Sequence, residues 1–245
     1  MRRRCLLALC LVQACAVSAQ ELTVSAAASL GDALHAIVPG FVARHPSARV
    51  RLNLAGSGQL LQQIAQGAPA DVFASADAET LDRAAAQGLI DPASRHDFTH
   101  NRLVLVAPPG SRLHSLADLA TPAVQRVAIG KPATVPAGRY ARQVLEAARL
   151  WAALGPKLIP ADNVRQVLDY VARGEVDAGF VYQSDALTAG RKVRVVQGLH
   201  GHAPIHYPVA VVRGSRQPAL AQAFVDHLRS PAAQALLQQK GFGGP

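Results

Sequence analysis

Five positions in this sequence carry groups that could bind an anion. Ser29, Ser57, Ala137 and Val164 each lie at the start of a predicted helix, and Tyr182 ends a predicted strand. The first turn of a helix leaves backbone N–H groups unpaired and carries the positive end of the helix dipole, so it attracts anions. A serine hydroxyl there can donate one more hydrogen bond. Neutral donors fixed around one cavity would select a small, fully dehydrated tetrahedral oxyanion by size and shape.

The two serines also have a purely structural interpretation. Ser29 with Asp32 three residues later is a variant of the capping box, which ties down a helix start without any ligand. The same interpretation holds for Ser57. Its neighbours Gly56 and Gly58 do not complete a dinucleotide fingerprint, which needs a third glycine, and the chain has no GK[ST] loop. Nucleotide binding is therefore not predicted.

Metal binding and catalysis have weaker support. His200, His202 and His206 could form a metal cluster, but no cysteine or nearby acidic residue completes it. Asp71 and Asp77 could be the paired carboxylates of a glycosidase, although a strand-end aspartate and a helix cap explain them more simply. The chain has no G-x-S-x-G elbow, and aromatic residues make up only 4% of it, which leaves little for sugar stacking. We expect no enzyme activity and no cofactor.

The N-terminal residues are typical of a secretory signal peptide. Three arginines at 2–4 precede an apolar run at 5–17, and small residues precede a cut after Ala19. Residues 1–19 are thus the predicted signal peptide, and the exported chain starts near Gln20 in the periplasm. All three cysteines, at positions 5, 10 and 15, fall inside this leader. A lipid anchor at Cys15 is the competing interpretation, which Gln13 disfavours.

The charge pattern argues against a nucleic-acid partner. The formal net charge is +9, but the basic residues that follow the leader are scattered, with no run longer than Arg191-Lys192. Proteins that bind nucleic acid concentrate such residues in a patch or stripe. A mild positive potential of this kind instead attracts small anions.

Alternating strand and helix patterns predict two α/β lobes. Residues 20–100 alternate between short apolar runs and helical periodicity, which indicates a mainly parallel sheet covered by helices. A second unit of the same kind covers 101–207, and a strand followed by two helices in 208–245 returns to the first lobe. The two lobes would be joined by a two-strand hinge. Ligands bind at the carboxyl ends of strands in such sheets, so the five positions should meet between the lobes.

Six segments in order resemble the periplasmic molybdate-binding proteins of ABC importers, and together they span nearly the whole exported chain. Each is weak alone, and the series is specific. The segments are AAASL at 26–30, GAPADVF at 67–73 with SAD at 75–77, VPAG at 135–138, DNVR at 162–165, VY at 181–182 with SD at 184–185, and YPVAVV at 207–212.

The resemblance implies a type II periplasmic-binding-protein fold that closes on molybdate or tungstate and delivers it to a membrane permease as a monomer. It implies that Ser29, Ser57, Ala137, Val164 and Tyr182 hold the anion through hydroxyls and main-chain amides, with no separate metal cation site. The family often carries a serine-rich stretch around the second serine, where this chain has glycines, which suggests more reliance on amides. A carrier of another oxyanion such as sulfate, or an enzyme on the same fold, remains the alternative.

Overall fold

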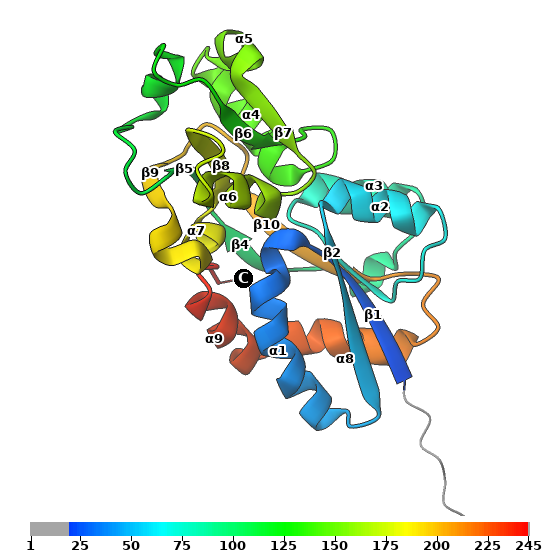
Figure 1. Ribbon diagram of the computed structural model, residues 1–245. Helices are drawn as coiled ribbons and strands as arrows, with labels where there is room; N and C mark the ends of the chain where they lie inside the picture. Colours follow the sequence, from blue (N-terminus) through cyan, green and yellow to red (C-terminus); the bar gives the residue numbers. More distant parts are fainter. Residues whose placement is uncertain (1–19, 245) are drawn as a thin grey trace, which may run out of the picture.

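The computed structural model describes residues 20–244, which form two lobes, each built on a five-stranded sheet (Figure 1). The predicted signal peptide and Cys15 lie outside these residues. Within the described part of the chain, no helix is both long and apolar enough to cross a membrane.

The first lobe contains the N-terminal β-α-β-α-β-α unit and the C-terminal helices. Its sheet has the order β2-β1-β3-β10-β4, with β1 parallel to β2 and β3. β10 runs antiparallel to both β3 and β4, because it enters this sheet from the second lobe. The sheet is therefore mixed. The strands are β1 (Gln20–Ala27), β2 (Ala48–Ala55), β3 (Val72–Ala74), β4 (His96–Asn101) and β10 (Ile205–Val211).

Helices cover both faces of this sheet because its strands are apolar on both sides. In β3, Phe73 belongs to the smaller core cluster under α2 and α3, whereas Val72 and Ala74 face the main core with α1 and α8. Figure 1 shows α2 and α3 on one side of the sheet and α1, α8 and α9 on the other. The helices are α1 (Gly31–Arg44), α2 (Ser57–Ala65), α3 (Ala78–Ala86), α8 (Pro218–Leu228) and α9 (Pro231–Gln239), with short 3-10 turns η1 (Ala28–Leu30) and η2 (Pro92–Ser94).

The second lobe has the sheet order β7-β6-β8-β5-β9. β6 is parallel to β7 and β8, and β5 is antiparallel to β8 and β9. Its strands are β5 (Leu103–Ala107), β6 (Val127–Gly130), β7 (Leu158–Ala161), β8 (Ala178–Tyr182) and β9 (Arg194–Gly198). Its helices are α4 (Pro136–Ala147), α5 (Trp151–Leu154), α6 (Val164–Ala172) and α7 (Gln183–Ala189), with 3-10 turns η3 (Leu116–Ala120), η4 (Gly155–Lys157) and η5 (Gly190–Lys192).

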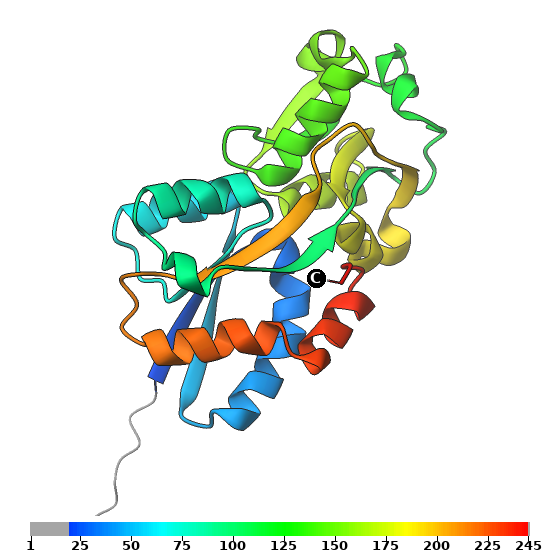
Figure 2. The same cartoon turned by 180° about the vertical axis from the view of Figure 1, so that it is seen from behind.

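The chain passes between the sheets from β4 to β5 and from β9 to β10. These two connections lie side by side, since Ile205 at the start of β10 pairs with Asn101 at the end of β4 (Figure 2). The predicted lobe boundary at 207–208 falls within β10, which joins the first sheet from Ile205 onward. The two lobes are thus joined by two adjacent connections.

Candidate functional site

The structure places all five predicted binding positions around one cavity between the lobes. η1 and α2 of the first lobe bring Ser29 and Ser57, and α4, α6 and β8 of the second lobe bring Ala137, Val164 and Tyr182. The cavity is small, with an empty volume of about 200 Å³. It therefore suits a small ion rather than a sugar or a nucleotide. Its other lining residues are Ala27, Ala28, Ala55, Gly56, Ala76, Val135, Pro136 and Asn163.

Two helix N-termini of the second lobe present backbone N–H groups to this cavity. Pro136 occupies the first turn of α4, where its missing N–H costs nothing, and Ala137 follows it. Asn163 caps α6, since its Oδ1 accepts the Gln166 N–H at 3.0 Å, and Val164 begins the helix. Within residues 20–244, neither the Ala137 nor the Val164 N–H donates to another residue. Both amides are available to an acceptor in the cavity.

The hydroxyl oxygens of the two serines each make a hydrogen bond within the protein. Ser57 Oγ accepts the Ala76 N–H at 3.0 Å, and Ser29 Oγ lies 2.9 Å from the hydroxyl of Tyr207. Both serines are buried. The capping-box interpretation of Ser29 is wrong, because no side chain caps η1 or α1 and Asp32 forms an ion pair with Arg165 instead.

Tyr182 contributes a buried hydroxyl without a partner. Its side chain is 1% exposed, and its Oη makes no hydrogen bond with any described residue. Burial raises the pKa of this hydroxyl well above its ordinary value, so it stays protonated and can donate. Leaving such a group unpaired costs roughly 1–3 kcal/mol, which an acceptor in the cavity would recover.

Among residues 20–244, no charged side chain lines the cavity, and two arginines in the first turns of α4 and α6 are paired with carboxylates. Arg165 of α6 lies 2.7 Å from Asp32 of α1 and 2.7 Å from Asp185 of α7, measured between guanidinium nitrogens and carboxylate oxygens. Burial raises the pKa of Asp185 to about 6, although Arg165 opposes that shift. The Arg165–Asp32 pair joins the two lobes beside the site.

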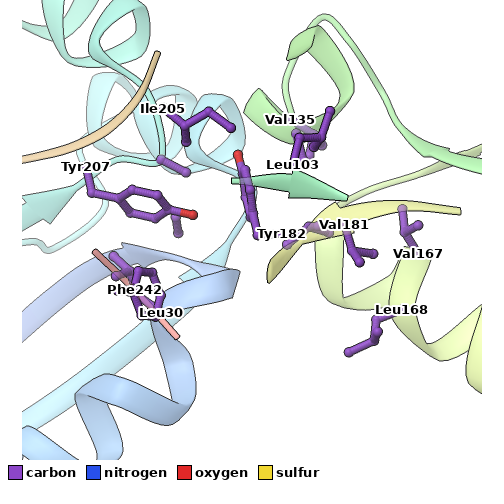
Figure 3. Packing of buried hydrophobic residues seen from close by; sticks show 14 of the residues in the cluster. Leu30, Leu103, Val135, Val167, Leu168, Val181, Tyr182, Ile205, Tyr207 and Phe242 are labelled. Atoms are coloured by element: carbon purple, nitrogen blue, oxygen red, sulfur yellow. The ribbon is translucent and has the colours of Figure 1, made fainter. Parts of the chain in front are cut away.

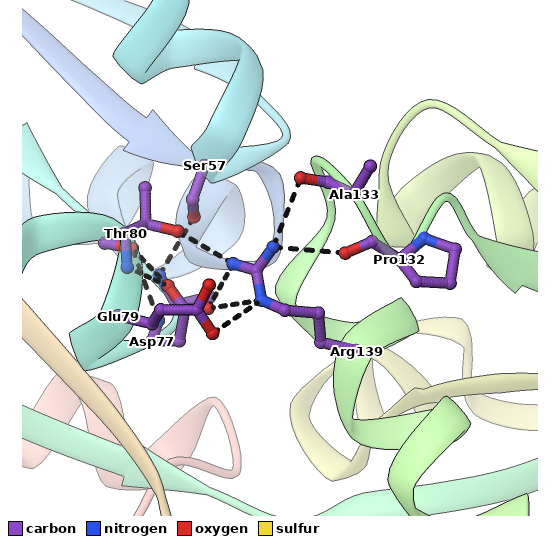
Figure 4. A network of polar contacts seen from close by, with 9 residues as sticks. Ser57, Asp77, Glu79, Thr80, Pro132, Ala133 and Arg139 are labelled. Carbon is purple, nitrogen blue, oxygen red and sulfur yellow. Dashed lines mark hydrogen bonds and ion pairs between the residues drawn. The ribbon is translucent and has the colours of Figure 1, made fainter. Parts of the chain in front are cut away.

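A second arginine joins the lobes on the other side of the cavity. Arg139 of α4 donates from Nε to Asp77 Oδ2 at 3.1 Å and from Nη2 to Thr80 Oγ1 at 2.8 Å (Figure 4). Its Nη1 also donates to the carbonyl of Pro132 in its own lobe at 3.1 Å. Asp77 meanwhile accepts the Thr80 N–H at 3.1 Å and so caps α3, as predicted. The start of α3 is thereby tied to the first turn of α4.

The glycines around Ser57 allow the lobes to approach each other. The Gly58 N–H donates to the carbonyl of Thr134 at 2.9 Å. A Cβ at Gly58 would lie 2.8 Å from both Cα and O of Thr134, and a Cβ at Gly56 would lie 2.8 Å from the carbonyl of Asp162. Main chain of the opposite lobe thus occupies the space that a side chain at Gly56 or Gly58 would need.

The alternative sites receive no support from the geometry. Among residues 20–244, no group of three His, Cys, Asp or Glu side chains could hold a metal ion, so His200, His202 and His206 do not form one. Asp71 accepts the Thr23 N–H at 2.7 Å and the Ser215 hydroxyl at 2.6 Å, which is a structural role. Asp77 is committed to its helix cap and to Arg139. The contacts of both aspartates are thus explained by the fold.

Sequence reasoning did not find Tyr207, Arg139 or Arg165. Tyr207 opens the segment YPVAVV, but nothing in that segment indicates a contact with Ser29, which is 178 residues away. Arg139 and Arg165 lie within the first turns of predicted helices, and that position was the available signal.

Two lobes that close around a small uncharged cavity define a solute-binding protein. The family described as bacterial extracellular solute-binding protein matches residues 22–243, and this chain belongs to it. The molybdate-binding protein ModA of Escherichia coli is 40% identical over 230 residues, covering 91% of this chain and 88% of that protein. The putative ABC transporter substrate-binding lipoprotein YvgL of Bacillus subtilis is 36% identical over 225 residues, covering 90% and 85%.

A solved structure has the same fold. The periplasmic molybdate-binding protein of Azotobacter vinelandii is similar with a TM-score of 0.81 and 25% identity, covering 91% of this chain and 99% of that one. The predicted fold class, a two-lobed α/β periplasmic binding protein, is therefore confirmed.

Proposed function

We propose that this protein captures molybdate, and tungstate likewise, in the cavity between its lobes and delivers the anion to the permease of an ABC importer. The observation that carries the proposal is the set of five neutral donors from two lobes around one small uncharged cavity: Ser29, Ser57, Ala137, Val164 and Tyr182. The names of its relatives, molybdate-binding proteins and a substrate-binding lipoprotein of an ABC transporter, support it.

The chemistry of the donors favours a fully deprotonated tetrahedral anion. Molybdate and tungstate are dianions whose oxygens only accept hydrogen bonds, and every group offered here can donate. A hydrogen bond to a charged group contributes roughly 1.5–3 kcal/mol, so five of them can hold a small ion without a counter-charge. Size and shape then decide which anion fits.

The same geometry supports a carrier rather than an enzyme. A serine nucleophile needs a base that accepts its proton. The contact of Ser57 Oγ is instead a donor, the Ala76 N–H. We propose a monomer that works in the periplasm without a cofactor, with molybdenum bound only as its oxyanion and no nucleic-acid partner.

Binding of four anions to the exported chain tests this proposal. Thermal unfolding and calorimetry would compare molybdate, tungstate, sulfate and phosphate. A ligand at a thousand times its dissociation constant stabilises the folded state by about 4 kcal/mol, which is a readily measured rise in melting temperature. We expect large rises with molybdate and tungstate and smaller ones with sulfate and phosphate. A larger rise with sulfate would make the protein a sulfate carrier, and no rise with molybdate would refute the proposal.

A further inference from the structure

Tyr207 lies directly behind Ser29 and is not itself part of the cavity lining. It comes from β10, is fully buried, and its hydroxyl lies 2.9 Å from Ser29 Oγ. Its ring packs edge-on between the rings of Tyr182 and Phe242, at centroid distances of 5.8 and 5.4 Å. Figure 3 shows the Tyr207 ring pointing from the first lobe toward Tyr182. This packing holds the Tyr207 hydroxyl in one place.

The direction of the Tyr207–Ser29 hydrogen bond follows from the other partner of Tyr207. That partner is Asn101 Nδ2, 3.5 Å from the phenol oxygen. The orientation of the Asn101 amide is fixed, because its Oδ1 accepts the Arg102 N–H at 2.9 Å and its Nδ2 lies 2.8 Å from Ser184 Oγ. An amide nitrogen cannot accept, so within residues 20–244 Ser29 Oγ is the acceptor that remains for the Tyr207 proton.

Either oxygen could donate in this contact, but only one arrangement gives both buried protons an acceptor once an anion is bound: Tyr207 donates to Ser29 Oγ, and Ser29 donates to the anion. The proton of Ser29 is then left for the cavity. The Ser57 proton is also left for the cavity, because the Ser57 oxygen accepts the Ala76 N–H. The oxygen of each serine thus accepts a hydrogen bond from the protein, and its proton remains for the anion.

We propose that Tyr207 is a positioning residue for anion binding: by donating to Ser29 Oγ it commits the Ser29 hydroxyl to donate to the bound oxyanion. This inference rests on the proposed function and names one source of its specificity. An anion that keeps a proton, such as hydrogen phosphate, needs an acceptor from the site, whereas Ser29 held in this way presents its proton and has one of its two lone pairs occupied by Tyr207.

A double-mutant cycle between Tyr207→Phe and Ser29→Ala tests the inference by calorimetry with molybdate. Tyr207→Phe removes the hydroxyl and keeps the packed ring, and we expect an affinity loss of about tenfold, which corresponds to about 1.4 kcal/mol. In the Ser29→Ala background, Tyr207→Phe should cost nothing further, because Tyr207 acts through Ser29. The preference for molybdate over phosphate should also fall in Tyr207→Phe. Unchanged affinity in the single variant, or losses that multiply in the double variant, would overturn the inference.

Tyr182→Phe serves as the matched control, because it removes another buried tyrosine hydroxyl whose effect does not pass through Ser29. Its loss should multiply with that of Ser29→Ala. A wild-type protein that binds none of the four anions contradicts the proposed function rather than this inference. In that case the same four proteins are compared by their unfolding free energies without ligand. A coupling energy of zero between Tyr207 and Ser29 would show that their hydrogen bond does not form and would overturn the inference.

Discussion

At the scale of single residues, the donors around the cavity differ in what they already do for the fold. The oxygens of Ser29 and Ser57 contact protein donors, whereas the Tyr182 hydroxyl and the amides of Ala137 and Val164 have no partner in the described chain. Removing a donor of the second kind should therefore affect binding far more than folding.

Tyr182→Phe separates these two effects. We expect molybdate affinity to fall about tenfold to a hundredfold, since a hydrogen bond to a charged group is lost. The unfolding free energy without ligand should not decrease, because the deleted hydroxyl is buried and unpaired. Calorimetry and chemical denaturation measure the two quantities. A variant that loses stability and keeps its affinity would contradict the assigned role.

The Val164 amide can be deleted without disturbing its helix. Val164 is the first residue of α6 and Asn163 before it is extended, so Val164→Pro fits the backbone. Val164→Ala is the control, because it also shortens the buried side chain but keeps the N–H. We expect Val164→Pro to bind molybdate at least tenfold more weakly than Val164→Ala. Equal affinities would show that this amide does not contact the anion.

How far these residues could be predicted depends on whether the signal is local. A helix start is visible in the sequence, so the Ala137 and Val164 amides and the Asp77 cap could be named in advance. The partner of Ser29 could not, because a hydrogen bond between residues 29 and 207 leaves no local pattern. Asp32 illustrates the same limit: its spacing from Ser29 predicts a cap, whereas tertiary contact pairs it with Arg165.

At the scale of elements, strands that are apolar throughout were predicted best. The apolar runs at 103–107 and 178–182 predict two strands, and β5 and β8 have these bounds, with every residue buried. No apolar run predicts β4, because its sequence, HDFTHN, is largely polar. None predicts β7 either, because it contains Pro160, which an edge strand tolerates. The sequence also could not show that β5 and β10 run against their neighbours. That depends on how each strand enters its sheet.

The contact between α2 and the 131–135 loop predicts an effect of a single methyl group. Gly58→Ala would place a Cβ 2.8 Å from main-chain atoms of Thr134, so the lobes could not close as far. We expect at least a tenfold loss of molybdate affinity, with little change in the unfolding free energy of the unliganded protein. Gly67→Ala is a poor control because Gly67 has a positive φ, whereas Gly110→Ala meets no atom within 4 Å and should bind normally. A Gly58→Ala variant with wild-type affinity would contradict this account of closure.

At the scale of the whole molecule, the two lobes are held together beside the cavity by arginines that each reach a carboxylate of the opposite lobe. Arg139 reaches Asp77, and Arg165 reaches Asp32 while also pairing with Asp185 in its own lobe. These contacts lie outside the lining, so they can favour closure without offering a positive charge to the ligand. Selection by shape and stabilisation of the closed form are thus carried by different residues.

Asp185 predicts how stability changes with pH. Its pKa is raised by burial to about 6, above an unfolded value of about 3.9, so the folded protein holds this proton more tightly. The protonated Asp185 therefore adds up to about 3 kcal/mol to the unfolding free energy below about pH 4. This contribution is lost as the pH rises through the folded pKa of about 6. Asp185→Asn cannot titrate, so the unfolding free energy of the wild type minus that of the variant should fall between pH 4 and 7. Denaturation at several pH values measures this difference, and a constant or rising difference would refute it.

The uncharged lining of the cavity has a consequence for the net charge of the protein with and without its ligand. A bound dianion adds two negative charges to the molecule, and because the donors that line the cavity keep their protonation state, no proton uptake offsets these charges. Loading would shift the isoelectric point of this basic protein and its electrophoretic mobility. The loaded and free forms would therefore differ in surface field as well as in shape, and a membrane partner can respond to both.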